Sequence, residues 1–245
     1  IHRENPQESV EIVIGSGIHR LSAPLELGPL DSKLKIVAAP QTQPVISGGR
    51  KIGGFTVRPD GVWEAQVEGR DFEQLWVGGR RAVRAREPDS GFFRMTGVTE
   101  GNVDGKTRQT VQLGDDASRW LRTLDGAALA KVQMLAYHKW DNTRRFIEKA
   151  DATGFTTLGA AMKPWNRWDT HSGLVFENFE AAMDEPGEWF RSPLGVLRYR
   201  PRPGEHPETS EVTAPVVDQL LVIRGTASAK VRNLEIRGIS FQHTG

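Results

Sequence analysis

The stretch VEIVIGSGIHRLSAPLEL, residues 10–27, decides the fold class of this chain. Its apolar residues Val10, Ile12 and Ile14 alternate with residues that face the other way, which is the period of a β-strand. The Gly-Ser-Gly sequence at 15–17 then predicts a turn, and a second short apolar series follows it. Short strands separated by glycine turns predict an all-β fold.

Two other segments have the same texture of strand, bend and strand. They are LKIVAAPQTQPVISGG at 34–49 and LLVIRGTASAKVRNLEIRGISF at 220–241. One rung of such a coil leaves its own apolar face uncovered and needs neighbouring rungs above and below it. The beginning and the end of the chain are therefore expected to stack as coils of one β-solenoid. The residues between them carry all seven Trp and are expected to form an inserted domain.

The middle of the chain is expected to form antiparallel strands. Gly78-Gly79 between two strand patterns predicts a two-residue hairpin, and Ser192–Gly195 predicts another turn. The alternation from Val132 to Trp140 predicts one long strand, with its turn at Asn142-Thr143. Repeated short strands with frequent turns favour a β-sandwich or a small barrel.

Three parts are expected along the chain. Residues 1–51 are predicted to form the N-terminal coils, and residues 52–212 the inserted β-sandwich-like domain. Residues 213–245 are predicted to resume the coil, which is truncated at Gly245.

Composition excludes several classes of protein. The chain has 32 Lys and Arg against 31 Asp and Glu, a net charge of +1, so it lacks the basic excess typical of nucleic-acid-binding proteins. It contains no Cys, which excludes disulfides and thiolate metal sites. No apolar run approaches the ~18 residues of a membrane span.

Five segments together resemble a known bacterial family. In this group, as in the β-helix β-xylosidases, a right-handed parallel β-helix is interrupted early by an inserted β-sandwich, and the chain is similar to the N-terminal part of such a secreted glycoside hydrolase. The segments are IVAAPQTQPVISGGRKIGGF (36–55), LWVGGRRAVRAREPDSGFF (75–93), AYHKWDNTRRFI (136–147), DEPGEWFRSPLGVLRYRPRPGE (184–205) and VRNLEIRGISFQHTG (231–245).

The resemblance implies an extracellular or periplasmic enzyme that acts on plant or microbial polysaccharide or oligosaccharide. It also implies that the catalytic carboxylates lie on later coils, beyond Gly245, so that these 245 residues alone are expected to be inactive. Glycoside hydrolysis normally requires a pair of carboxyl groups. The coil segments of this chain show no convincing pair, and the catalytic residues are unknown.

The best candidate for substrate binding lies at the expected end of the long strand. It consists of His138, Trp140, Asp141, Arg144 and Arg145. An aromatic ring can cover the C–H face of a pyranose, and charged groups can form directional hydrogen bonds with its hydroxyls. The alternative interpretation is a core Trp beside a hairpin salt bridge.

A second candidate is the loop PWNRWDTH at 164–171, which carries Trp165 and Trp168. Two Trp three residues apart in a polar loop favour sugar contact, although Trp also anchors long loops. A metal site at His138 and Asp141, or at Asp169 and His171, would have only two ligands, so no cofactor is expected. Calcium is possible in a solenoid, but the sequence has no Asp-rich calcium loop.

Two other functions remain open from the sequence. A β-solenoid of this kind also occurs in non-catalytic carbohydrate-binding or adhesin-like proteins. A polysaccharide lyase is the alternative within the enzymes, and it would need a Lys or Arg base on the later coils. In each case the expected partners are a carbohydrate and the rest of the chain's own solenoid.

Overall fold

The computed structural model describes residues 8–69, 71–114, 117, 119–124 and 126–245 of the chain. Strands are the main regular structure of these residues and the helical segments are only short turns, so the predicted all-β fold class is confirmed. The chain divides into two compact units. The first comprises the residues up to Gly53 together with 69–81 and 211–245, and the second comprises 54–68 and 82–210.

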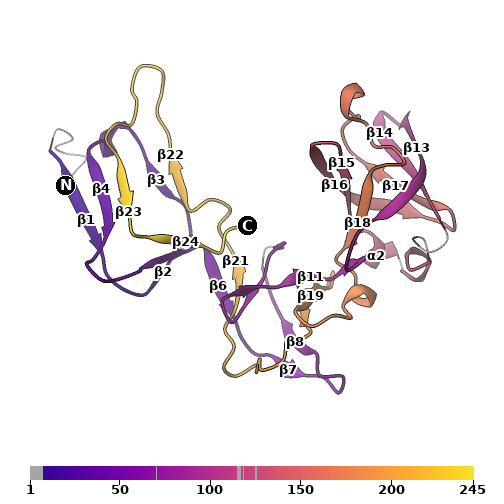
Figure 1. The fold of residues 1–245 in the computed structure, drawn as a ribbon, viewed down its shortest axis with the longest axis horizontal. Coiled ribbons are helices and arrows are strands. Elements are labelled where there is room, and N and C mark those ends of the chain that lie inside the picture. The colour runs from indigo at the N-terminus through magenta and orange to yellow at the C-terminus, as the bar shows by residue number, and fades with distance from the viewer. Residues whose placement is uncertain (1–7, 70, 115–116, 118, 125) are drawn as a thin grey trace. The chain divides into compact units, whose positions relative to one another are not determined.

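The first unit contains three short parallel sheets, which form three sides of one coil in Figure 1. The order in these sheets is β1-β4-β23, β2-β5-β24 and β3-β22, so every sheet joins a strand from the start of the chain to a strand from its end. The strands are β1 (Val10–Ile14), β2 (Ile18–Arg20), β3 (Leu25–Leu27), β4 (Leu34–Ala38), β5 (Val45–Ser47), β22 (Leu221–Ile223), β23 (Glu235–Arg237) and β24 (Ser240–Gln242). The predicted stacking of the two chain ends is confirmed by these pairings.

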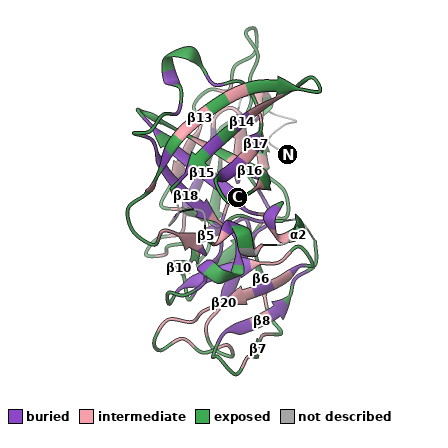
Figure 2. Ribbon diagram, turned by 90° about the vertical axis from the view of Figure 1, so that its right-hand side faces the viewer, coloured by how far each residue is buried: buried purple, intermediate pink, exposed green. Residues whose placement is uncertain are grey.

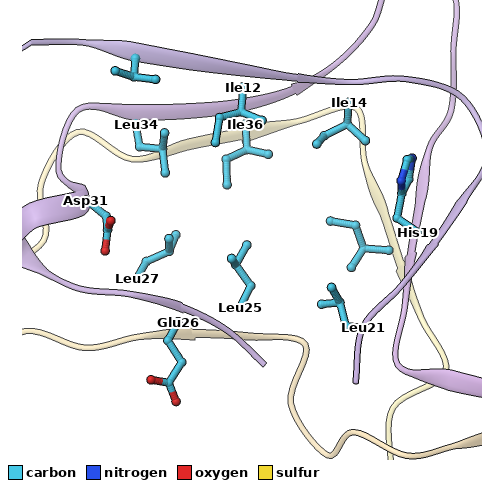
Figure 3. A pocket seen from close by; sticks show the side chains of 12 residues that line it. Ile12, Ile14, His19, Leu21, Leu25, Glu26, Leu27, Asp31, Leu34 and Ile36 are labelled. Carbon is cyan, nitrogen blue, oxygen red and sulfur yellow. The ribbon is translucent and has the colours of Figure 1, made fainter. Parts of the chain in front are cut away.

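Apolar residues in register line the interior of this coil. Ile12 of β1 lies opposite Ile36 of β4, and Ile36 lies opposite Ile236 of β23. Ile36, which has a neighbour on each side, is only 5% exposed, whereas Ile12 is 43% exposed. The interior holds a cavity of about 430 Å³, into which Leu25 points while Glu26 points away (Figure 3). Burial thus depends on the neighbouring rung, as the sequence pattern predicted.

A small antiparallel sheet stands where the chain leaves this coil and returns to it. Its order is β10-β9-β21-β6, so the outgoing strand β6 pairs with the returning strand β21. Residues 69–81, which the sequence pattern placed in the insert, belong to the first unit because β9 pairs with β21. The strands are β6 (Gly49–Ile52), β9 (Trp76–Val77), β10 (Arg80–Arg81) and β21 (Val212–Pro215).

Close packing around Gly49 holds this junction together. A Cβ added at Gly49 would lie 2.3 Å from Cγ2 of Thr213 and 2.9 Å from Cβ of His243. The His243 ring packs edge-on against Trp76, with 4.9 Å between the ring centroids. Its Nδ1 lies 2.9 Å from the hydroxyl of Ser47, with which it is hydrogen-bonded, and burial lowers the pKa of this histidine. Residues from four segments of the chain therefore meet at this junction, and they leave no space for a Cβ at Gly49.

The second unit is built around an antiparallel sheet that closes on itself. Strands β18, β13, β14, β17, β16 and β15 pair in that order, and β15 pairs again with β18, which completes a barrel. Figure 2 shows the buried residues along β15 and β18. The interior includes Met134, Phe155 and Phe176, each at most 3% exposed. The strands are β13 (Phe93–Val103), β14 (Lys106–Leu113), β15 (Gln133–His138), β16 (Asp141–Ala150), β17 (Gly154–Leu158) and β18 (Gly173–Glu177).

A further sheet of the second unit has the order β11-β19-β20-β8-β7, and β12 pairs with β18 at the side of the barrel. Trp63, Trp189 and Tyr199 are buried in this sheet. The remaining elements are β7 (Thr56–Val57), β8 (Trp63–Gln66), β11 (Val83–Arg84), β12 (Arg86–Glu87), β19 (Glu188–Arg191), β20 (Val196–Tyr199), α2 (Gly126–Leu129), and the 3₁₀ turns η1 (Pro29–Asp31), η2 (Leu121–Thr123), η3 (Pro164–Asn166) and η4 (Glu180–Ala182).

Two of the predicted turns are confirmed and one is wrong. Gly78 and Gly79 connect β9 to β10 with φ values of 56° and 75°, which glycine adopts without steric cost. The turn at Ser192–Gly195 connects β19 to β20. The third turn lies at Lys139-Trp140 instead of Asn142-Thr143, because β15 ends at His138, which pairs with Asp141.

Substitution of Gly49 by Ala is expected to lower the free energy of unfolding by about 1–3 kcal/mol, because the added methyl group overpacks the junction. Urea denaturation of the two proteins would measure this difference. Gly53→Ala is the matched control, since a Cβ at Gly53 meets no atom within 4 Å. Equal effects of the two substitutions would contradict the role assigned to the junction.

Candidate functional site

The hairpin of β15 and β16 carries the first group of predicted site residues, and the loop that contains η3 carries the second. Both belong to the second unit. The structure joins the two segments through hydrogen bonds, so residues that are more than 20 positions apart in the sequence form one local site.

His138 is the link between the hairpin and the loop. The side chain is buried, and its Nδ1 lies 3.1 Å from Oδ1 of Asn166, a buried residue of η3. Its Nε2 lies 2.9 Å from the hydroxyl of Thr143 on β16. The Trp168 ring packs at a tilt to the imidazole, with 6.4 Å between the centroids. With both ring nitrogens engaged by the protein, His138 positions the loop.

Trp140 lies in the turn of the hairpin and not on the strand face of His138, where the sequence pattern placed it. The two-residue turn begins with Lys139, whose φ is 50°. The indole therefore faces solvent from this turn and is 74% exposed. The interpretation of Trp140 as a core residue is wrong.

The charged residues of the hairpin have separate partners. The Asp141 carboxylate accepts a hydrogen bond from the backbone N–H of Asn142 at 2.8 Å. Arg144 forms an ion pair with Glu177 on β18 at 3.5 Å. Arg145 donates from Nη2 to the carbonyl of Ala160 at 3.2 Å, which ties β16 to the segment before η3.

The two Trp of the loop have different environments. Trp168 is only 3% exposed and belongs to the core of the barrel unit, so it anchors the loop. Trp165 is 65% exposed, and its backbone carbonyl accepts a hydrogen bond from Nζ of Lys139 at 3.0 Å. The structure thus places exposed indoles on both linked segments.

The start of the loop is attached to the barrel through Glu100. One oxygen of this carboxylate accepts hydrogen bonds from the backbone N–H of Met162 at 2.7 Å and from Nε2 of Gln109 at 2.9 Å. Burial alone would raise the pKa of Glu100, but these bonds and the nearby Arg167 hold it below its ordinary value. The carboxylate is therefore ionised at neutral pH and fixes the loop.

The structure also brings together three carboxyl groups that the sequence pattern did not connect. Asp89, Asp184 and Glu188 have oxygen atoms within 4.8 Å of one another. Asp89 and Asp184 are exposed, whereas Glu188 on β19 is 3% exposed. Asp89 lies nearly 100 positions from the others, so no local spacing signals the cluster.

Within this cluster, Glu188 has a structural role. One of its oxygens accepts hydrogen bonds from the backbone N–H groups of Asp184 and Glu185, each at 3.1 Å, and so closes the loop before β19. Burial raises the pKa of Glu188 from 4.5 to about 7, and the charges of Asp89 and Asp184 act in the same direction. The two backbone hydrogen bonds oppose this shift only in part.

Comparison with known proteins gives one informative likeness. No family model and no curated protein matches the chain. A solved structure named "Glycoside hydrolase" is similar over 98% of this chain, with a TM-score of 0.77 and 26% sequence identity. The matched part is 44% of that structure, so the chain spans less than half the length of this glycoside hydrolase.

The helical turns give no indication of a membrane segment. Among the described residues, every helix is too short or too polar to cross a lipid bilayer.

The pKa of Glu188 predicts a pH-dependent stability. A carboxyl group whose pKa is raised by folding stabilises the fold in its protonated form, and this contribution is lost as the pH rises from 4.5 through about 7. The loss amounts to about 3 kcal/mol. Glu188→Gln keeps an oxygen acceptor for the loop but has no carboxyl group to titrate. This variant is therefore expected to lose the decline of the unfolding free energy between pH 4.5 and about 7, as measured by urea denaturation at several pH values.

The exposed Glu208 provides the control for this prediction. Glu208→Gln is expected to leave the pH profile of the unfolding free energy like that of the unchanged protein. If the Glu188→Gln profile also keeps its decline between pH 4.5 and 8, the assignment of the decline to Glu188 is wrong.

Proposed function

We propose that this chain is the N-terminal portion of a carbohydrate-active enzyme, a glycoside hydrolase that acts on plant or microbial polysaccharide or oligosaccharide. The observation that carries the proposal is the likeness to the glycoside hydrolase structure, which extends over 98% of the chain at a TM-score of 0.77. At that coverage both units of the chain contribute to the likeness, which reaches beyond a single common sheet.

The same proposal assigns the first unit to the start of a right-handed parallel β-helix. Its support is the set of parallel pairings in which β4 lies between β1 and β23, and β5 between β2 and β24. In this scheme the barrel unit is an insert, which leaves the helix after β5 and returns before β22. Further coils would cover the exposed side chains of the last rung, such as Phe241, which is 39% exposed.

The catalytic carboxylates are proposed to lie on those further coils. In a glycoside hydrolase one carboxyl group protonates the leaving oxygen, and the other acts as nucleophile or activates water. Among the acids of the coil, Glu235 is surrounded by cations: it lies near Lys35 at 3.9 Å and near Arg237 at 3.7 Å. The reaction is proposed to need no cofactor, and the enzyme to work outside the cytoplasm.

The experiment compares this 245-residue chain with a longer gene product that continues beyond Gly245. The longer protein is expected to release sugar from a panel of aryl glycosides and polysaccharides, whereas the 245-residue chain is expected to release none. Turnover by the short chain would overturn the placement of the catalytic groups.

Two other outcomes would replace the proposed reaction. Release of unsaturated uronate products, detected by their ultraviolet absorbance, would identify a polysaccharide lyase. Binding of polysaccharide without any turnover by the longer protein would favour the adhesin-like class.

A further inference from the structure

Trp140 and Trp165 differ from the other tryptophans of the barrel unit. They are 74% and 65% exposed, whereas Trp63, Trp168 and Trp189 are at most 3% exposed and Trp120 is half-buried. We propose that Trp140 and Trp165 form a binding platform for the pyranose rings of a polysaccharide chain. The proposal rests on the proposed function and names a substrate-binding site for it on the second unit.

The two indoles are carried by segments that the protein holds together. Lys139, which precedes Trp140, donates a hydrogen bond to the backbone carbonyl of Trp165 at 3.0 Å. The residues adjacent to this bond, His138 before Lys139 and Asn166 after Trp165, are hydrogen-bonded to each other at 3.1 Å and buried. The exposed rings therefore project from backbone that is fixed by two adjacent links.

Hydrogen bonds to barrel residues also fix the segment that precedes η3. Met162 is bound through its N–H to Glu100, and the Ala160 carbonyl accepts hydrogen bonds from Gln109 and Arg145, both at 3.2 Å. Trp168 fills the core on the other side of η3. A surface whose backbone is ordered before the ligand arrives loses less conformational entropy on binding, which favours a weakly interacting ligand such as a sugar.

The surroundings of the indoles suit a carbohydrate better than a protein partner. Trp140 stands between Lys139 and Asp141, and Trp165 is preceded by Lys163 and Pro164. The centre of a protein–protein interface is depleted of such charges. A pyranose ring presents an apolar C–H face for the indole and hydroxyls at its edge for charged neighbours. Neutral sugars and uronates share this chemistry.

The test measures binding to the 245-residue chain without any turnover. Cellohexaose, xylohexaose and oligogalacturonate are titrated into the protein, and binding is followed by tryptophan fluorescence and calorimetry. At least one of these probes is expected to bind. Trp140→Ala and Trp165→Ala are each expected to weaken that binding by about three- to tenfold, and the double variant by the product of the two.

Phe146→Ala is the matched control, because Phe146 is an aromatic residue of the same hairpin that is 54% exposed. It is expected to bind like the unchanged protein. Circular dichroism and thermal unfolding should show that all four variants remain folded, since none of these side chains is buried. The probe preferred by the unchanged protein tells a neutral chain from a uronate chain.

The proposal is overturned if no probe binds, or if both Trp variants bind as the unchanged protein does. It is also overturned if the chain self-associates with concentration and both Trp substitutions abolish that association, because the surface would then be an interface between copies. Tryptophan-dependent binding together with an inactive longer protein would reject only the hydrolase. A hydrolase with unchanged binding in the variants would reject only the platform.

Discussion

The pairing of β4 with β1 on one side and β23 on the other is the constraint on which the chain's organisation depends. Ile36 of β4 is buried because Ile12 and Ile236 lie in register with it. One of these comes from the start of the chain and the other from its end. The hydrophobic effect therefore requires two segments some 200 residues apart to meet, and whatever lies between them must leave the coil and return to the same place.

The junction where the chain leaves and returns shows how this requirement is met. Gly48 and Gly49 both lie against His243, and Gly49 also lies against Thr213, with no room for a Cβ at Gly49. The hydrogen bond between Ser47 and His243 crosses from the second rung to the third. Because β6 and β21 pair over four residues, backbone hydrogen bonds within the first unit hold the outgoing and the returning segment side by side.

The barrel unit has a hydrophobic core of its own. Its described strands pair in a closed cycle, which leaves no exposed sheet edge among them. The hydrogen bond from Nζ of Lys139, in the β15–β16 turn, to the carbonyl of Trp165 joins the two segments that carry the exposed Trp140 and Trp165. A fold that buries its core in the barrel can therefore support exposed aromatic rings at no cost to that core.

The sequence by itself determined the all-β class, the stacking of the two ends and the glycine turn at 78–79, because alternation and turn chemistry are local properties of the chain. It did not determine which members of the predicted site are buried. His138 and Trp168 became interior residues and Trp140 a turn residue, because β15 pairs with both β16 and β18 and so ends at His138. The cluster of Asp89, Asp184 and Glu188 was likewise decided only by tertiary structure. Its members come from separate loops and strands, and only the folded barrel unit brings their carboxyl groups within reach of one another.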